Sequence, residues 1–189
     1  MQMNKPNFLL VLLVPSVVLL IPLVAMWIKA DGWAWTAADF CVAWLFLAGV
    51  LMAYQLIARN AATRAYRAAT GLALGTGLTL LWLNGAVGLI GSENNPANLM
   101  YGGVLAIGLL GAGIARLRPL GMARVLFVTA GAQFLVPVLA LVLRPGDFDP
   151  GIAPVFGLNL GFVVMFAGAG FVFRHSGTRE GNSRTPAAA

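Results

Sequence analysis

The side chains best suited to chemistry lie in and around one short polar segment, Gly91 to Tyr101 (GSENNPANLMY), within a long apolar region. Carboxylates and amides at one membrane level could bind a cation, relay protons or recognise a polar headgroup. Antiparallel packing of the helices on either side is expected to bring a set of such residues to that level. The candidate ligand or ion cluster is Asp39, Asn84, Glu93, Asn94, Asn95 and Asn98.

Helix capping accounts for the same residues without a ligand. Asp39 is expected in the first turn of a helix, where the macrodipole favours a carboxylate. Gly91 suits the position just past a helix end, and Asn95 followed by Pro96 is typical of an N-cap and first helical residue. Glu93 is then left in water at the apex of the turn. We prefer this interpretation, because it explains each residue separately.

Other candidate chemistry is sparse. The carboxylates of Asp147 and Asp149 have a spacing compatible with calcium or magnesium, but a solvated turn is the simpler interpretation because further oxygen ligands are lacking. Cys41 has no base near it in sequence, and it is the single cysteine, which excludes an internal disulfide. His175 is the single histidine. We therefore predict no catalytic residue, no metal site and no cofactor, and an enzyme is disfavoured.

Three amides, Asn84, Gln133 and Asn159, fall inside apolar segments. Hydrogen bonds between helices are the expected role of such residues, each contributing about 1 kcal/mol. A substrate pathway is the alternative.

The composition indicates that lipid is the solvent for much of the chain. Of 189 residues, 60% are hydrophobic and 10% are charged, whereas soluble domains carry about 25% charged residues. The net charge of +6 does not indicate nucleic acid, because the basic residues fall between apolar segments. The expected partner is the lipid bilayer.

Hydropathy predicts an all-α, polytopic transmembrane bundle, a domain over residues 1–174 with a disordered cytoplasmic tail over 175–189. Pro15 and Pro22 should bend the first span, for which a cleaved signal peptide is the alternative. Glycine pairs at Gly71/Gly75 and Gly157/Gly161 favour helix packing inside the bundle, or association with a second copy or another membrane protein. The six expected spans are about 8–28, 36–58, 68–90, 96–117, 125–143 and 153–173.

The distribution of charge predicts the orientation. Alternate connections place ten of the 12 basic residues on one side, leaving Lys29 and Arg144 on the other, a bias that marks the first side as cytoplasmic. Six spans with both termini in the cytoplasm follow. The residues on the cytoplasmic side are Lys5, Arg59, Arg64, Arg67, Arg116, Arg118, Arg124, Arg174, Arg179 and Arg184.

Two motifs carry a resemblance: the central segment GSENNPANLMY and the loop ARLRPLGMAR at residues 115–124, with Asp39-Phe40 before them. Over about residues 39–143 the chain resembles an uncharacterised family of small bacterial multi-span inner-membrane proteins. That resemblance implies the cytoplasmic membrane of a bacterium and no particular activity.

Two function classes remain open. One is a compact helical-bundle accessory or oligomeric membrane component without chemistry of its own, favoured by the glycine-rich faces. The other is a small transporter or channel for protons or cations that uses the outer-side carboxylates Asp39 and Glu93. Transport sites usually hold ionisable residues near the middle of the membrane, whereas these two lie at its edge.

Overall fold

The computed structural model describes residues 6–59, 61, 63–148 and 151–184, and within them every regular element is a helix. The sequence predicts a single transmembrane domain over 1–174. By their mutual contacts the helices form two compact units, unit 1 (Met1–Asn60) and unit 2 (Ala61–Ala189); the prediction of one transmembrane domain stays a prediction.

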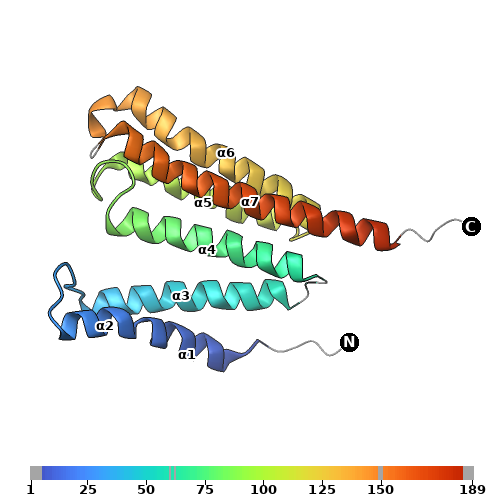
Figure 1. The fold of residues 1–189 in the computed structure, drawn as a ribbon, viewed down its shortest axis with the longest axis horizontal. Coiled ribbons are helices and arrows are strands. Elements are labelled where there is room, and N and C mark those ends of the chain that lie inside the picture. Colours follow the sequence, from blue (N-terminus) through green and yellow to red (C-terminus); the bar gives the residue numbers. More distant parts are fainter. Residues whose placement is uncertain (1–5, 60, 62, 149–150, 185–189) are drawn as a thin grey trace, which may run out of the picture. The chain divides into compact units, whose positions relative to one another are not determined.

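Unit 1 is an antiparallel pair formed by a broken helix and a continuous one. The broken helix consists of α1 (Phe8–Val18) and α2 (Leu20–Trp27), and the continuous helix is α3 (Ala37–Ala58) (Figure 1). The break falls at Leu19, where Pro22 has no N–H to donate to the carbonyl of Val18. The predicted interruption is therefore present at Pro22, whereas Pro15 lies inside the continuous helix α1.

Polar contacts at two levels hold unit 1 together. The Asn7 N–H donates to Gln55 Oε1 at 2.6 Å, and Trp44 Nε1 donates to Ser16 Oγ at 3.2 Å. Asn7 precedes α1 while Gln55 is near the end of α3, so these bonds fix the antiparallel register of the pair.

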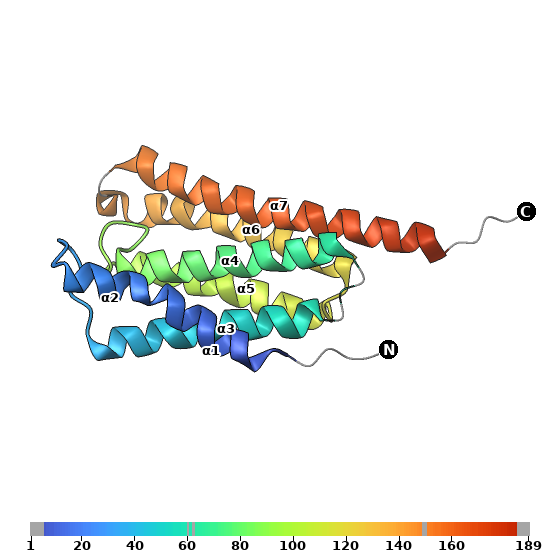
Figure 2. The ribbon, with the colours of Figure 1, turned by 60° about the horizontal axis from the view of Figure 1, so that its bottom comes forward.

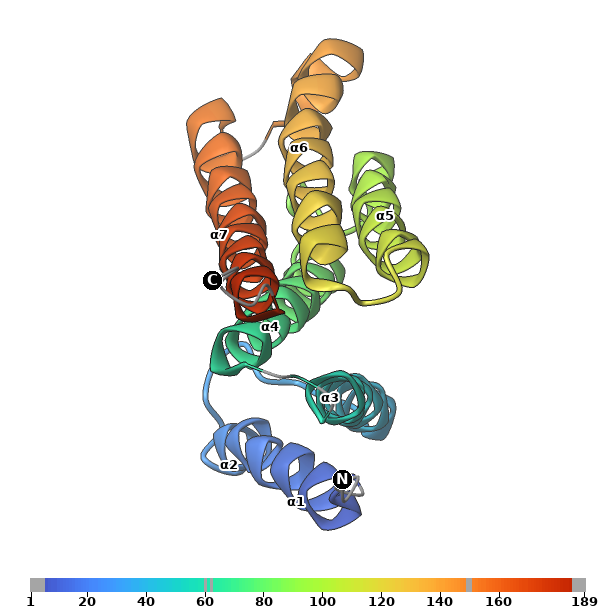
Figure 3. The same cartoon turned by 90° about the vertical axis from the view of Figure 1, so that its right-hand side faces the viewer.

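Unit 2 contains four long helices, α4 (Arg64–Ala86), α5 (Met100–Ile114), α6 (Pro119–Leu143) and α7 (Ile152–Arg184). The short 3₁₀ helices η1 (Pro96–Leu99) and η2 (Pro145–Asp147) lie in its connections. Helix α6 lies between α5 and α7, and α7 also packs against α4 (Figures 2 and 3).

Glycines mark the closest approaches between helices of unit 2. A Cβ on Gly111 of α5 would come within 2.6 Å of the Val125 side chain on α6, and one on Gly170 of α7 would lie 3.2 Å from the Phe127 ring. The glycine pairs singled out from the sequence behave differently. A Cβ on Gly75, Gly157 or Gly161 would meet nothing within 4 Å, and Gly157 and Gly161 are exposed; Gly71 lies on the same helix as Gly75.

Five helical segments in the described part of the chain are long and apolar enough to cross a membrane. Helix α4, which corresponds to the span predicted at 68–90, is 23 residues long but more polar than these five. Thr70 and Thr76 lie on it, and their hydroxyls donate hydrogen bonds to the backbone carbonyls of Tyr66 and Leu72 in the same helix. The five segments are Phe8–Trp27, Ala37–Ala58, Pro96–Ile114, Pro119–Leu143 and Ile152–Thr178.

Several helix ends differ from the predicted boundaries, and local caps explain the shifts. Helix α4 begins at Arg64 because the Thr63 hydroxyl accepts the Tyr66 N–H, and it ends at Ala86, shortly before Gly88 at φ +71°. Helix α6 begins at Pro119, six residues before the predicted start, since proline is favoured at the first helical position.

The last helix is longer than predicted. Helix α7 continues to Arg184, so residues 175–184, predicted as part of a disordered tail, are helical. Extending an existing helix adds one backbone hydrogen bond per residue without a new nucleation cost. Residues 185–189 of the predicted tail lie outside the described residues.

Candidate functional site

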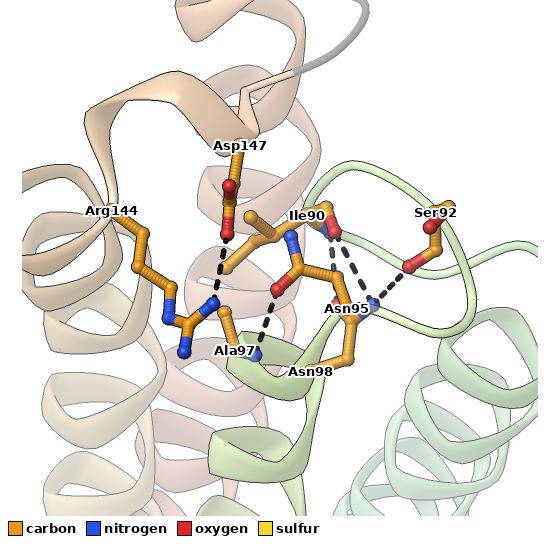
Figure 4. A network of polar contacts seen from close by, with 7 residues as sticks. All are labelled: Ile90, Ser92, Asn95, Ala97, Asn98, Arg144 and Asp147. Atoms are coloured by element: carbon orange, nitrogen blue, oxygen red, sulfur yellow. Dashed lines mark hydrogen bonds and ion pairs between the residues drawn. The ribbon is translucent and has the colours of Figure 1, made fainter.

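The connection between α4 and η1 is organised by the amide of Asn98 (Figure 4). Asn98 Oδ1 accepts the N–H groups of Leu89 and Ile90 at 3.1 and 3.0 Å. Its Nδ2 donates to the carbonyls of Ile90 and Ser92 at 3.3 and 2.7 Å. These bonds use both acceptor and both donor positions of a primary amide. The side chain is buried and serves the loop backbone.

Two glycines let this loop close on itself and on its neighbour. Gly88 has φ +71°, and a Cβ there would lie 2.5 Å from the Ser92 carbonyl oxygen. Gly91 has φ +67°, and a Cβ there would lie 2.7 Å from the carbonyl oxygen of Asp147, in η2. A side chain at either position would collide with backbone, so both must be glycine for the loop to keep this form.

The capping interpretation holds for the two residues on which it was based. Asn95 is the N-cap of η1, and its Oδ1 accepts the Ala97 N–H at 2.9 Å, with Pro96 following. Asp39 forms a capping box with Thr36, whose backbone N–H and hydroxyl donate to Asp39 Oδ2 at 2.6 and 2.8 Å. Gly91 was predicted to lie just past the end of α4. The helix ends earlier, at Ala86, and the glycine that follows its end is Gly88.

The remaining members of the predicted cluster divide into exposed and buried. Glu93 and Asn94 are exposed at the tip of the loop. Asn84 lies below it, and its Nδ2 donates to the Asn98 carbonyl at 3.2 Å while its buried Oδ1 has no hydrogen-bond partner among the described residues. In unit 2 the structure therefore brings together Asn84, Asn95 and Asn98, as supports of one loop. Asp39 belongs to unit 1.

The other side of this region is formed by η2. Arg144 and Asp147 make an ion pair at 3.7 Å directly beside the loop (Figure 4). Both side chains are partly exposed, so the pair contributes at most about 1 kcal/mol. Asp147 was considered as a calcium or magnesium ligand together with Asp149, which lies outside the described residues. In the described part of the chain, no three His, Cys, Asp or Glu residues are grouped to hold a metal ion.

A second polar cluster is buried between α5, α6 and α7. Asn159 Oδ1 accepts two hydrogen bonds, from Tyr101 Oη at 2.8 Å and from Gln133 Nε2 at 2.9 Å. Asn159 Nδ2 donates to the Val155 carbonyl at 2.8 Å. All three side chains are at most 1% exposed. This amide network ties three helices through one oxygen atom.

Two of the three residues of the amide network lie well inside their helices. Gln133 is about 15 Å along α6 from Leu143, and Asn159 is about 10 Å along α7 from Ile152, at a rise of about 1.5 Å per residue. Half the hydrocarbon thickness of a bilayer is about 15 Å. Gln133 and Asn159 thus lie inside α6 and α7, whereas Tyr101 reaches them from the first turn of α5.

One hydrogen-bond acceptor of Gln133, the side-chain oxygen, is left without a partner in the described part of the chain. Its Oε1 is buried and has no partner among the described residues. The backbone carbonyl of Gln133 also lacks its usual helical donor, because residue 137 is a proline without an N–H. Buried acceptors are normally paired, so Gln133, like Asn84, has a polar atom whose usual partner is absent among the described residues.

Sequence reasoning found part of this cluster. Gln133 and Asn159 were predicted to bond between helices, and they do. Tyr101 was noted only as the end of the polar segment, although a tyrosine at the start of an apolar span needs a partner for its hydroxyl when buried. The need of a buried tyrosine hydroxyl for a hydrogen-bond partner was the signal from which Tyr101 could have been predicted.

The arrangement supports helix association more directly than catalysis. The network consists of uncharged amides and a phenol, and the carboxylates of Asp39 and Glu93 belong to a cap and an exposed loop. Cys41 is exposed. No family model matches the chain, and neither a curated protein nor a solved structure is significantly similar to it.

Proposed function

We propose that the chain is a multi-pass protein of the bacterial cytoplasmic (inner) membrane that acts as a helical-bundle accessory or oligomeric component. Membrane insertion is supported by the apolar surface. On α5, the side chains of Leu109, Leu110 and Ile114 are 72%, 69% and 84% exposed. Exposing so many large side chains to water is unfavourable, whereas lipid solvates them.

We further propose six spans, with α4 as the sixth beside the five strongly apolar segments. At about 1.5 Å per residue, a helix of this length is about 35 Å long and exceeds a hydrocarbon core of about 30 Å. Its threonine hydroxyls bond to the helix backbone and so are satisfied without water. Six spans place both termini on the side that carries most of the arginines, in agreement with the positive-inside rule.

The observation that favours an oligomeric component is the free glycine face of α7. Gly157 and Gly161 are exposed, and a Cβ at either would touch no other part of unit 2. They lie four residues apart on one side of a helix, the spacing that lets two membrane helices approach closely. Leu158, Leu160 and Val164 beside them are also exposed, at 44%, 53% and 62%. This face is available to a second copy or another membrane protein.

Replacing Gly161 by leucine tests the assignment. The added side chain should hold a partner helix away, so the full-length variant in mild detergent should have a smaller particle mass by light scattering than the wild type. Gly131→Leu is the matched control, because Gly131 is an exposed glycine on α6 with nothing within 4 Å of a Cβ. It should leave the mass unchanged.

A wild-type particle containing one chain, in detergent and in bilayers, would contradict the oligomeric role. So would a Gly161→Leu variant that assembles as the wild type does. The topology is tested separately by reporters fused after Thr63, expected in the cytoplasm, and after Asn94, expected on the opposite side; either in the other compartment would contradict the six-span arrangement.

A further inference from the structure

Three segments meet at one end of unit 2, the end at which α4 begins, α5 turns into α6 and α7 passes residue 173 (Figure 1). Tyr66 is at the junction: its hydroxyl donates to the Leu117 carbonyl at 2.7 Å, and its ring contacts the Phe173 ring edge-on at a centroid distance of 5.0 Å. The hydroxyls of Thr63 and Ser176 are 2.7 Å apart. These contacts hold the three segments in fixed relation.

The turn between α5 and α6 is itself tightly constrained. Arg116 and Leu117 both adopt the left-handed conformation, with φ of 50° and 56°. Their N–H groups donate to the carbonyls of Gly113 and Ala112, which closes the end of α5. Together with the Tyr66 bond to Leu117, this fixes the turn against the first turn of α4.

The surface of this end is strongly basic: the charged side chains that the structure describes there are arginines, while Glu180 of α7 lies outside the described side chains. The described carboxylates of unit 2, Glu93 and Asp147, belong to the loops at the opposite end. The basic rim comprises exposed arginines from all three segments: Arg64, Arg67, Arg116, Arg118, Arg124 and Arg174.

We propose that the basic rim binds the phosphodiester headgroups of anionic phospholipids in the adjacent leaflet. This inference rests on membrane insertion as proposed above, which puts the helix ends at the depth of the headgroups. A guanidinium group can bind a phosphate with two parallel hydrogen bonds. A surface rich in exposed arginines beside an anionic leaflet has complementary charge.

The use of arginine rather than lysine distinguishes a surface that binds lipid phosphate from one that only sets the orientation in the membrane. Lysine and arginine serve the positive-inside rule equally, yet the basic side chains described in unit 2, apart from His175, are all arginine. Lysine is a compact point charge, whereas arginine offers a planar fork of donors. Replacing arginine by lysine therefore preserves the charge and the orientation while removing bidentate phosphate binding.

The test compares the full-length wild type with the triple variant Arg64→Lys/Arg116→Lys/Arg118→Lys in mixed micelles. Phosphatidylglycerol and phosphatidylcholine are supplied in equal amounts, and bound lipid is counted by native mass spectrometry. The wild type should prefer phosphatidylglycerol, and the triple variant should lose that preference several-fold. Arg144→Lys, in the ion pair at the other end, should behave as the wild type does.

Three outcomes would overturn the proposal: equal binding of the two lipids by the wild type, an unchanged preference in the triple variant, or an equal loss in Arg144→Lys. Complete displacement of phosphatidylglycerol by millimolar inorganic phosphate would also overturn it, because the site would then belong to a soluble anion. Release of the wild type from membranes by alkaline carbonate would contradict membrane insertion itself, which keeps the two failures distinct.

Discussion

Unit 2 contains two buried clusters built around asparagine, and they do different work. Asn98 bonds to backbone groups of residues 89–92, within nine positions in sequence, and all of its hydrogen-bonding capacity is used. Asn159 bonds to side chains on two other helices, from Tyr101 and Gln133, 58 and 26 positions away. The first cluster shapes a loop, whereas the second joins helices that are distant in the chain.

The two clusters also differ in the environment that a side chain meets when it loses its hydrogen-bond partner. The Asn98 cluster is buried as well, but it lies next to the exposed loop residues Ser92, Glu93 and Asn94, so water is close to a lost partner. The three side chains of the amide network are at most 1% exposed, and two of them lie well inside α6 and α7, so a lost partner leaves a polar group in an apolar interior. Removing an asparagine side chain should therefore lower the free energy of unfolding more in the amide network than in the Asn98 cluster.

The largest effect is expected for Asn159→Leu. It removes the one oxygen that accepts from both Tyr101 Oη and Gln133 Nε2, so two buried donors lose their partner. We expect the free energy of unfolding in detergent to fall by about 2–3 kcal/mol, since each unsatisfied donor costs about 1–3 kcal/mol and relaxation recovers some of that cost. Thermal or denaturant unfolding of the purified chain measures it.

Asn94→Leu is the control for that substitution, because Asn94 is exposed in the loop. Its stability should stay within about 0.5 kcal/mol of the wild type. If Asn159→Leu were no more destabilising than Asn94→Leu, the network would have no part in holding α5, α6 and α7 together.

A smaller effect is expected for Asn98→Ala. The buried N–H groups of Leu89 and Ile90 lose their acceptor, but the space left by the amide adjoins the exposed loop tip and admits water, so the loss should be about 1–2 kcal/mol. The local signature is faster amide hydrogen exchange at Leu89 and Ile90, with exchange along α6 unchanged. Uniformly faster exchange over all of unit 2 would show that the loop is not an independent element.

Gln133→Met sharpens the comparison within the amide network. Methionine has a similar length and fills the space, and the substitution removes the unpartnered Oε1 along with the bond to Asn159. The two changes oppose each other, and Asn159 Oδ1 still accepts from Tyr101. We expect a change in stability of at most about 1 kcal/mol in either direction, measured by the same unfolding experiment. A loss as large as that of Asn159→Leu would mean that Oε1 is satisfied in the membrane.

Features determined by nearby residues could be predicted from the sequence. The N-caps at Asp39 and Asn95, the bend of the first helix and the exposure of Glu93 all depend on a few adjacent residues, and the structure confirms them. The apolar composition likewise indicated helices suited to a membrane, and the described chain contains them.

Features determined by contacts between distant segments could not be predicted. The basic loop at 115–124 looked like a turn, but Pro119 starts α6 there, and a Cβ on Gly121 would be 2.9 Å from Ala115, so the glycine permits a sharp reversal. Asn98 looked like a candidate ligand because nothing in its sequence neighbourhood shows that its amide bonds back to residues 89–92. Asn159 and Tyr101 are 58 positions apart, and only the packing of α5 against its neighbours brings them together.

The smallest effect is expected for Glu93→Gln. Glu93 is exposed at the loop tip, beyond the bonds that Asn98 makes to the loop backbone. Removing its charge should change stability by less than about 0.5 kcal/mol and leave hydrogen exchange at Leu89 and Ile90 as in the wild type. Proton or cation flux into vesicles containing the purified chain is the decisive measurement, with Asp39→Asn in parallel. A flux that the wild type supports and Glu93→Gln abolishes would make the chain a transporter that uses the loop carboxylate, and the accessory-component assignment would then be wrong.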